Sequence, residues 1–283
     1  MTIETLSEHA AFGGTVGFYR HTSATTNCDM QFSVFVPPQA RSGPVPMLTW
    51  LSGLTCTEET FMIKSGAQRT AAELGLMILN PDTSPRGEDV PDDPAGGWDF
   101  GIAAGFYLNA TEDPWRRNYQ MYDYVVKELQ WLALENFAAD SARQGIFGHS
   151  MGGHGALTLG LKHPEIYRSI SAFAPISHPS ACPWGEKAFS HYLGADRGAW
   201  ADYDATELAA NVATKPANTI LVDQGLADQF LEEQLKPEDF EAACRNADID
   251  LELRRQPGYD HGYYFISTFM DDHLRHHARN LTS

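Results

Sequence analysis

Residues 144–162 carry three local patterns in immediate succession, and this order leaves few folds open. Residues 144–147 predict a short buried strand, and residues 154–162 predict a helix. Between them, residues 148–152 fit the pattern Gly-x-Ser-x-Gly, whose glycines allow a turn too tight for side chains. Such a turn lifts the hydroxyl of Ser150 to the carboxyl edge of a sheet, whereas an ordinary glycine-rich turn would carry an inert serine. The order of strand, turn and helix favours a nucleophilic serine.

The rest of the chain alternates predicted strands with predicted helices, as in a parallel sheet built from crossover units. Further strands are expected at residues 32–36, 47–51, 76–79, 169–175, 219–222 and 251–254. Further helices are expected at residues 65–74, 117–137, 237–247 and 264–281. Residues 84–101, which are rich in proline and glycine, predict a long loop. Because no linker or repeat interrupts this order, we expect residues 1–283 to form a single α/β domain with a mostly parallel central sheet and helices on both faces.

The charge of the chain excludes several classes of partner. It has 37 acidic and 20 basic side chains, a formal net charge of −17, and no stripe of lysine and arginine that would bind nucleic acid. Residues 1–20 lack the pattern of a signal peptide, and no later window reaches the roughly 18–20 uncharged apolar residues of a membrane span. We therefore expect a cytoplasmic protein with neither a nucleic-acid nor a membrane partner.

The four cysteines are scattered through a chain that is long enough to bury a core without disulfides. They are Cys28, Cys56, Cys182 and Cys244. We expect reduced thiols that are buried as packing residues. No Cys-x-x-Cys pair is present, so a zinc ribbon or a dithiol redox site has no ligands.

A serine hydroxyl becomes a good nucleophile when a histidine removes its proton and a carboxylate orients that histidine. His261 is the best placed candidate, because it follows the last predicted strand and a Pro-Gly turn and precedes the final helix. In hydrolases that use the glycine-serine motif, the base likewise comes last in the chain.

The positions of six other histidines argue against a role as the catalytic base. Three of them, His273, His276 and His277, lie within the final helix. Their spacing imitates a metal site, but no glutamate follows the first of them as a His-Glu-x-x-His site requires. Three more, His149, His154 and His163, are too close in sequence to the serine to approach it from across the sheet. We therefore expect no metal site.

The carboxylate should come from a loop after a strand that lies between the serine and His261 in the chain. Asp223 ends a predicted strand, and Asp228 follows five residues later, past a glycine turn. Asp223 emerges while the chain is still extended, whereas Asp228 can swing towards a histidine loop. The residues alone separate the two only weakly. We favour Asp228 and keep Asp223 as the alternative.

The oxyanion that forms during acyl transfer needs two backbone N–H donors. Met151, directly after the serine, supplies one of them. Residues 51–55 follow a predicted strand, and Gly53 lets their backbone turn inward, so this segment is a plausible source of the second donor. The alternative is an ordinary connection between a strand and a helix.

With these residues identified, the chain from about residue 28 onward resembles the S-formylglutathione hydrolase (esterase D) family of α/β-hydrolases. The motifs that carry the resemblance lie at residues 50–57, 81–87, 98–101, 104–107, 148–155, 182–185, 223–225, 228–230, 259–261 and 263–265. Several of them are far more specific than the serine motif. Thr60 and Gly262 depart from the asparagine and serine common in similar sequences, which affects the shape of the substrate cleft.

Carried over position by position, the resemblance makes Ser150 the nucleophile, Asp228 the orienting acid and His261 the base. It assigns the oxyanion hole to the N–H groups of Leu54 and Met151. The resemblance thus decides between the two aspartates.

The resemblance, rather than the spacing, names a small-molecule substrate. It implies hydrolysis of S-formylglutathione to formate and glutathione in formaldehyde detoxification, with no metal or organic cofactor, and it suggests a homodimer. One alternative is a broad-specificity carboxylesterase or acyltransferase with the same triad. Another is a catalytically inactive binding protein on a hydrolase fold, which the complete order of serine, aspartate and histidine disfavours.

The substrate of such an enzyme is an anion, so any attraction to an acidic protein has to be local. We expect the substrate pocket to be lined by Cys56, Trp98, Trp184, Lys64 and Arg86. The candidate cations of the cleft are Arg86, Lys64 and Lys187, each of which is otherwise an ordinary surface charge.

Cys56 has three possible interpretations. It lies two residues after Leu54, so it should border the acyl pocket. A nucleophilic role would need a nearby base and a lowered pKa, but His261 is already assigned to the serine. A buried packing residue would be unreactive, whereas a thiol on the pocket wall would be dispensable for catalysis but harmful once modified.

Overall fold

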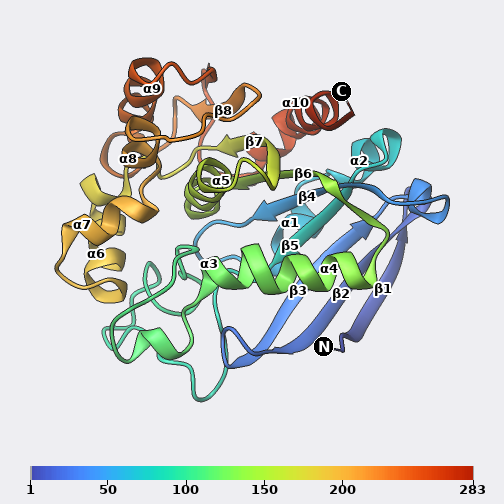
Figure 1. The fold of residues 1–283 in the computed structure, drawn as a ribbon, viewed down its shortest axis with the longest axis horizontal. Coiled ribbons are helices and arrows are strands. Elements are labelled where there is room, and N and C mark those ends of the chain that lie inside the picture. The colour runs from blue at the N-terminus through green and yellow to red at the C-terminus, as the bar shows by residue number, and fades with distance from the viewer. Residues whose placement is uncertain (1, 283) are drawn as a thin grey trace.

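The computed structural model describes residues 2–282, whose strands form a nine-stranded sheet in the order β1-β2-β3-β5-β4-β6-β7-β8-β9 (Figure 1). The strands are β1 (Glu4–Ala11), β2 (Gly14–Ser23), β3 (Cys28–Val36), β4 (Val45–Leu51), β5 (Met77–Pro81), β6 (Ala139–His149), β7 (Tyr167–Phe173), β8 (Ile220–Gly225) and β9 (Leu251–Gln256). The helices are α1 (Glu58–Lys64), α2 (Gln68–Leu74), α3 (Met121–Asp123), α4 (Gln130–Asn136), α5 (Met151–Lys162), α6 (Pro183–Tyr192), α7 (Arg197–Trp200), α8 (Ala205–Ala210), α9 (Pro237–Asn246) and α10 (Tyr263–Thr282). A π-helical turn, Tyr124–Leu129, joins α3 to α4.

The sheet is parallel from β5 to β9 and antiparallel at the end that holds β1, β2 and β3. Every residue of β4, β5 and β8 is buried, as expected for parallel strands that are covered on both faces. β1 is largely exposed and forms one edge of the sheet. The predicted fold class, a mostly parallel sheet with helices, is confirmed.

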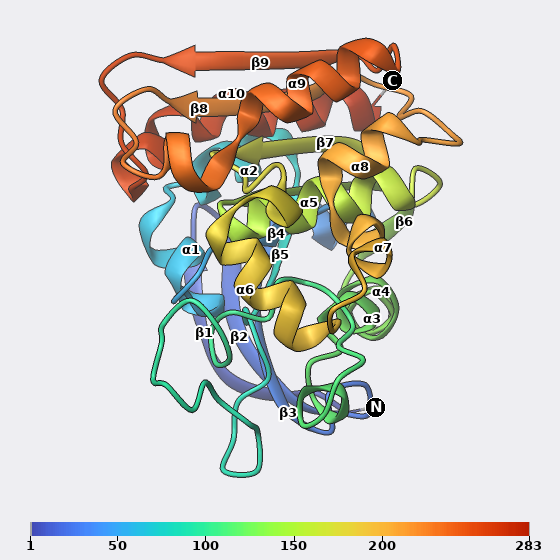
Figure 2. The ribbon, with the colours of Figure 1, turned by 90° about the vertical axis from the view of Figure 1, so that its left-hand side faces the viewer.

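Helices cover the sheet on both sides. Figure 2 shows α1 on one side of the strands and α3 with α4 on the other. α5 packs on β4, β6 and β7, and α10 packs on β6, β7, β8 and α2. In the core, Trp50 from β4 stacks on Phe61 from α1 with their ring centres 4.2 Å apart. None of the described helices is long and apolar enough to cross a membrane.

Four strands direct the candidate residues to one edge of the sheet. β4, β6, β8 and β9 are mutually parallel, so their carboxyl ends point the same way. The segments that follow them contain Leu54, Ser150, Asp228 and His261, respectively. Ligand sites of open α/β sheets form outside this edge of the strands.

The sequence patterns predicted the interior of the fold better than its periphery. The seven predicted strands are present, and residues 84–101 form a loop without helix or strand. The predicted helix at residues 117–137 begins at Met121, after a short 3₁₀ turn. The hairpin of β1 and β2 and the helices α1, α6, α7 and α8 were not predicted, because β1 is largely exposed and each of these helices has ten residues or fewer, a length at which helical spacing is weak.

Candidate active site

Ser150 lies on a sharp turn between β6 and α5. Its backbone has φ +58° and ψ −119°, a conformation that residues other than glycine rarely adopt. A Cβ atom on Gly152 would lie 1.9 Å from the carbonyl oxygen of Leu51, and one on Gly148 would lie 2.3 Å from that of Gly152. Both flanking positions therefore require glycine, as the motif predicts. The N–H of Ser150 donates to the carbonyl oxygen of Phe173 on β7 at 3.0 Å, which holds the turn against the sheet.

His261 and Asp228 are in direct contact. Nδ1 of His261 lies 2.5 Å from Oδ2 of Asp228, whose side chain is fully buried. The other carboxylate oxygen accepts the backbone N–H of Phe230 at 2.8 Å. A carboxylate fixed in this way binds the Nδ1–H tautomer of the imidazole, so Nε2 is the nitrogen that can accept a proton.

One pocket contains the serine and the histidine. It has a volume of about 340 Å³, and its lining residues are Gly53, Leu54, Thr55, Cys56, Thr60, Lys64, Trp98, His149, Ser150, Trp184, Phe230, His261 and Tyr263. Within residues 2–282, no hydrogen bond joins the Ser150 hydroxyl to His261. In unliganded enzymes this contact is often long, and it shortens when substrate binds.

The loop after β4 lies against the nucleophile turn. A Cβ atom on Gly53 would lie 3.1 Å from Cβ of Ser150, so the two backbones approach closely at this point. The hydroxyl of Tyr107 donates to the carbonyl oxygen of Ser52 at 2.8 Å, and the N–H of Thr55 donates to Ala103 at 3.1 Å. These bonds fix the segment that carries the N–H of Leu54.

The other expected donor is the backbone N–H of Met151, which follows Ser150 on the turn between β6 and α5. Met151 is the first residue of α5, and the first N–H groups of a helix have no partner within the helix. Leu54 lines the pocket, whereas the side chain of Met151 is buried in the core. Met151 directly follows Ser150 in the chain, and Leu54 lies on the wall of the pocket that contains Ser150.

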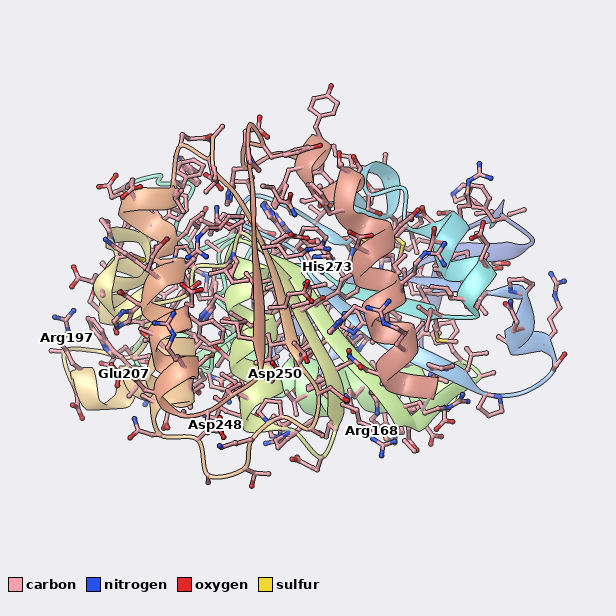
Figure 3. All side chains as sticks on the ribbon, turned by 90° about the horizontal axis from the view of Figure 1, so that it is seen from above. Arg168, Arg197, Glu207, Asp248, Asp250 and His273 are labelled. Carbon is pink, nitrogen blue, oxygen red and sulfur yellow. The ribbon has the colours of Figure 1, made fainter. Side chains whose placement is uncertain are left out.

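The alternative acid, Asp223, belongs to a different network. Its carboxylate accepts hydrogen bonds from Arg254 Nε at 2.9 Å, Gln256 Nε2 at 2.8 Å and His273 Nε2 at 3.0 Å. Burial alone would raise the pKa of Asp223, but the bonds from His273 and Arg254 outweigh it and lower this pKa to about 2. Figure 3 shows His273 on α10, on the side that faces the strands. Asp223 thus ties β8 to β9 and α10 and does not contact His261.

The other histidines of α10 are buried structural residues. Nε2 of His277 lies 2.9 Å from the hydroxyl of Ser171, which also contacts Nδ1 of His273 at 2.8 Å. His276 is buried near Asn280, 3.2 Å from its side-chain nitrogen. Among the described residues, no three His, Cys, Asp or Glu side chains form a group that could hold a metal ion.

Four of the five expected pocket residues line the pocket: Cys56, Lys64, Trp98 and Trp184. Trp98 is 54% exposed and meets Trp184 edge to face, with ring centres 5.6 Å apart. The expectation for Arg86 is wrong, since this residue is absent from the described lining. Its guanidinium donates to the carboxylate of Asp82 at 2.6 Å and to the carbonyl oxygen of Cys56 at 3.2 Å.

Sequence reasoning missed three large side chains on the pocket wall. His149 precedes the serine, and its ring centre lies 4.4 Å from that of His261. Phe230 and Tyr263 each follow a proposed catalytic residue by two positions. Both residues belong to motifs that carry the family resemblance, at residues 228–230 and 263–265, and these motifs are the available signal.

The cysteines are free, as expected, but two of them are not buried. Cys182 and Cys244 lie in the core, whereas Cys28 and Cys56 are partly exposed. Cys28 starts β3 near the end of the sheet, and Cys56 borders the pocket. The expectation that all four are buried is therefore wrong for these two, which lie at the start of a strand and in a loop.

Comparisons with known proteins agree with this architecture. The family model described as "Putative esterase" matches residues 23–276. The chain is 52% identical to a mouse (Mus musculus) S-formylglutathione hydrolase over 284 residues, covering all of both chains. It is 54% identical to one from Arabidopsis thaliana over 265 residues, covering 93% of this chain and 92% of the relative.

A solved structure extends the similarity to three dimensions. An S-formylglutathione hydrolase from Agrobacterium tumefaciens superposes with a TM-score of 0.95 at 54% identity, covering 98% of this chain and 99% of the other. Identity of this extent over the whole chain shows an enzyme of the hydrolase class. The chain therefore belongs to the S-formylglutathione hydrolase family, a group of esterases with the α/β-hydrolase fold.

Proposed function

We propose that this protein is a serine thioesterase that hydrolyses S-formylglutathione to formate and glutathione, a step of formaldehyde detoxification. The observation that carries the proposal is the contact of His261 with the buried Asp228, in one pocket with Ser150 on its strained turn. Its full-length relatives bear the name of this activity.

In the first half of the reaction, the hydroxyl oxygen of Ser150 attacks the formyl carbon while Nε2 of His261 takes the hydroxyl proton. The carbonyl oxygen becomes negative and accepts hydrogen bonds from the N–H groups of Leu54 and Met151. Asp228 stabilises the imidazolium that forms. The carbon–sulfur bond then breaks, and glutathione leaves with the proton from His261.

In the second half, His261 takes a proton from water, and the resulting hydroxide attacks the formyl group on Ser150. The ester bond breaks, the proton returns from His261 to the serine oxygen, and formic acid leaves and ionises to formate. Each step moves only protons and acyl groups, so the proposed chemistry calls for no metal or organic cofactor.

The test is a substrate panel with purified protein: S-formylglutathione, S-acetylglutathione and 4-nitrophenyl acetate. We expect kcat/KM for S-formylglutathione to exceed the other two at least about tenfold, equivalent to ~1.4 kcal/mol of transition-state binding. A higher kcat/KM for the aryl ester would instead identify a broad carboxylesterase. Labelling of Ser150 by an organophosphate would exclude an inactive binding protein.

Cys56 offers a second test of the pocket. Because it lines the pocket with Ser150, an adduct on its sulfur should block the substrate. Burial raises the pKa of the Cys56 thiol, which argues against an activated nucleophile and predicts that its alkylation accelerates as pH rises. We expect a bulky maleimide to inhibit the wild type, whereas Cys56→Ser keeps most of its activity and becomes insensitive.

The matched control is Cys28→Ser, because Cys28 is also partly exposed but does not line the pocket among the described residues. This variant should remain sensitive to the maleimide. Loss of activity in untreated, folded Cys56→Ser would support the nucleophile interpretation. Equal sensitivity of wild type and Cys56→Ser would place the reactive thiol elsewhere.

We also propose that the protein acts in the cytoplasm and forms a homodimer. Four free cysteines support a reducing compartment. The dimer rests on the family resemblance, and light scattering on the purified protein measures it directly.

A further inference from the structure

The active-site pocket contains little charge. Its described lining includes no aspartate or glutamate, and Lys64 is the one lysine or arginine among those residues. His149 on the same wall is held neutral, since burial and the neighbouring His261 lower its pKa well below 6.5. In a chain with a formal charge of −17, the pocket wall thus carries one permanent charge, and that charge is positive.

The other two cations suggested by the sequence are engaged by carboxylates. Nε of Arg86 lies 2.6 Å from Oδ2 of Asp82. The ammonium of Lys187 contacts Asp99 at 2.5 Å and Asp93 at 3.0 Å, which ties α6 to the loop of residues 84–101. Their charges are already compensated within the protein.

Lys64 is in a different situation. It is the last residue of α1, it is exposed, and no carboxylate of the described residues forms an ion pair with it. Its ammonium lies 5.7 Å from the ring centre of Tyr263, whose side chain also lines the pocket. The ring carries no charge that would neutralise the ammonium, which therefore remains able to meet an anion.

The chemistry of the substrate matches this arrangement. The formyl group is the smallest acyl group, so nearly all of the surface that the pocket can recognise belongs to the thiol. Glutathione carries two carboxylates and one ammonium, a net charge of −1 that the protein as a whole repels. On the basis of the proposed function, we propose that the ammonium of Lys64 binds a carboxylate of the glutathione leaving group.

This contact should act on binding rather than on the chemical step. The carboxylate lies away from the reacting carbon, so its charge does not change between the bound substrate and the transition state. An interaction of equal strength in both states lowers KM and leaves kcat unchanged.

The test compares Lys64→Met and Lys64→Arg with Lys215→Met as the matched control. Lys215 precedes β8, at the opposite edge of the sheet, and pairs with Asp248 at 3.1 Å. We expect Lys64→Met to raise KM for S-formylglutathione about 3- to 10-fold, with kcat unchanged within about twofold. Lys64→Arg should retain most of the affinity because it keeps the charge, and Lys215→Met should match the wild type.

A second substrate isolates the carboxylates. In the diethyl ester of S-formylglutathione both carboxylates are masked, and release of the thiol reports its hydrolysis. We expect wild type and Lys64→Met to show the same KM for this ester. An equal rise in KM on both substrates, or no rise on either, would overturn the proposal.

Inhibition separates this inference from the proposed function. S-methylglutathione, which cannot be hydrolysed, is titrated against 4-nitrophenyl acetate hydrolysis by wild type and Lys64→Met. A 3- to 10-fold larger inhibition constant in Lys64→Met supports the carboxylate contact even if S-formylglutathione is not hydrolysed, an outcome that would reject the proposed function alone. Equal inhibition constants, or no inhibition of the wild type, would reject the contact.

Discussion

Ser150→Ala should lose on the order of 10⁴-fold or more of the thioesterase kcat without loss of folding. The reason is chemical, because alanine has no oxygen to form the formyl-enzyme. The fold should be unaffected, since the Ser150 backbone bonds to Phe173 and His154 are kept. Steady-state hydrolysis of S-formylglutathione measures the loss, and circular dichroism with thermal melting verifies the fold.

His261→Ala should lose a similar amount, because the proposed base and nucleophile act as a unit. The double variant Ser150→Ala/His261→Ala should then be hardly slower than either single variant, since removing one member already disables the pair. A folded Ser150→Ala protein with more than a few per cent of wild-type activity would overturn the assignment of the nucleophile.

Asp228→Asn should lose about 10³- to 10⁴-fold in kcat. The asparagine side chain keeps the size of the carboxylate but can present an N–H to Nδ1 of His261, which then favours the wrong imidazole tautomer. It also removes the negative charge that stabilises the imidazolium. KM should change little, because the Asp228 side chain is buried beneath the histidine and does not line the pocket among the described residues.

Asp223→Asn is the matched control for this change. We expect it to retain far more activity than Asp228→Asn but to lose stability, by about 3 kcal/mol, because Arg254 and His273 lose a buried partner. Urea denaturation at pH 7 measures the free energy of unfolding. If the activity of folded Asp223→Asn were the lower of the two, the choice of Asp228 as the acid would be wrong.

The same carboxylate predicts the sign of a pH effect on stability. The pKa of Asp223 is lowered from 3.8 to about 2 in the folded protein, so its ionised form stabilises the fold. That contribution is complete above about pH 4 and is lost as the pH falls through about 2. Between these values, wild type should lose more stability than Asp223→Asn does.

Short-range sequence patterns predict the seven strands from β3 to β9 and several of the helices, in the correct order. The apolar run before Gly148 and the glycines around Ser150 restrict the backbone locally, so the strand, turn and helix of this segment follow from short-range sterics. The order of serine, aspartate and histidine in the chain likewise indicates a hydrolase. The more specific motifs, which lie on both sides of this segment, then indicate the family.

Which side chains meet depends on how the strands are arranged in the folded protein. Asp223 and Asp228 lie five residues apart on one strand and its loop, and local patterns treat both as acids near a sheet edge. Only the parallel pairing of β8 with β9 shows that Asp223 binds Arg254 and that Asp228 binds His261. Contacts between distant segments depend on strand order and register, which apolar periodicity does not encode.

The same reason separates the three basic residues suggested for the pocket. In the sequence, Lys64, Arg86 and Lys187 are equivalent positive charges near recognised motifs. Folding brings carboxylates to Arg86 and Lys187, while Lys64 stays at the pocket wall over Tyr263. The sequence shows which residues are charged. Whether a charge is paired within the protein or is free to bind a substrate depends on its neighbours in the folded chain.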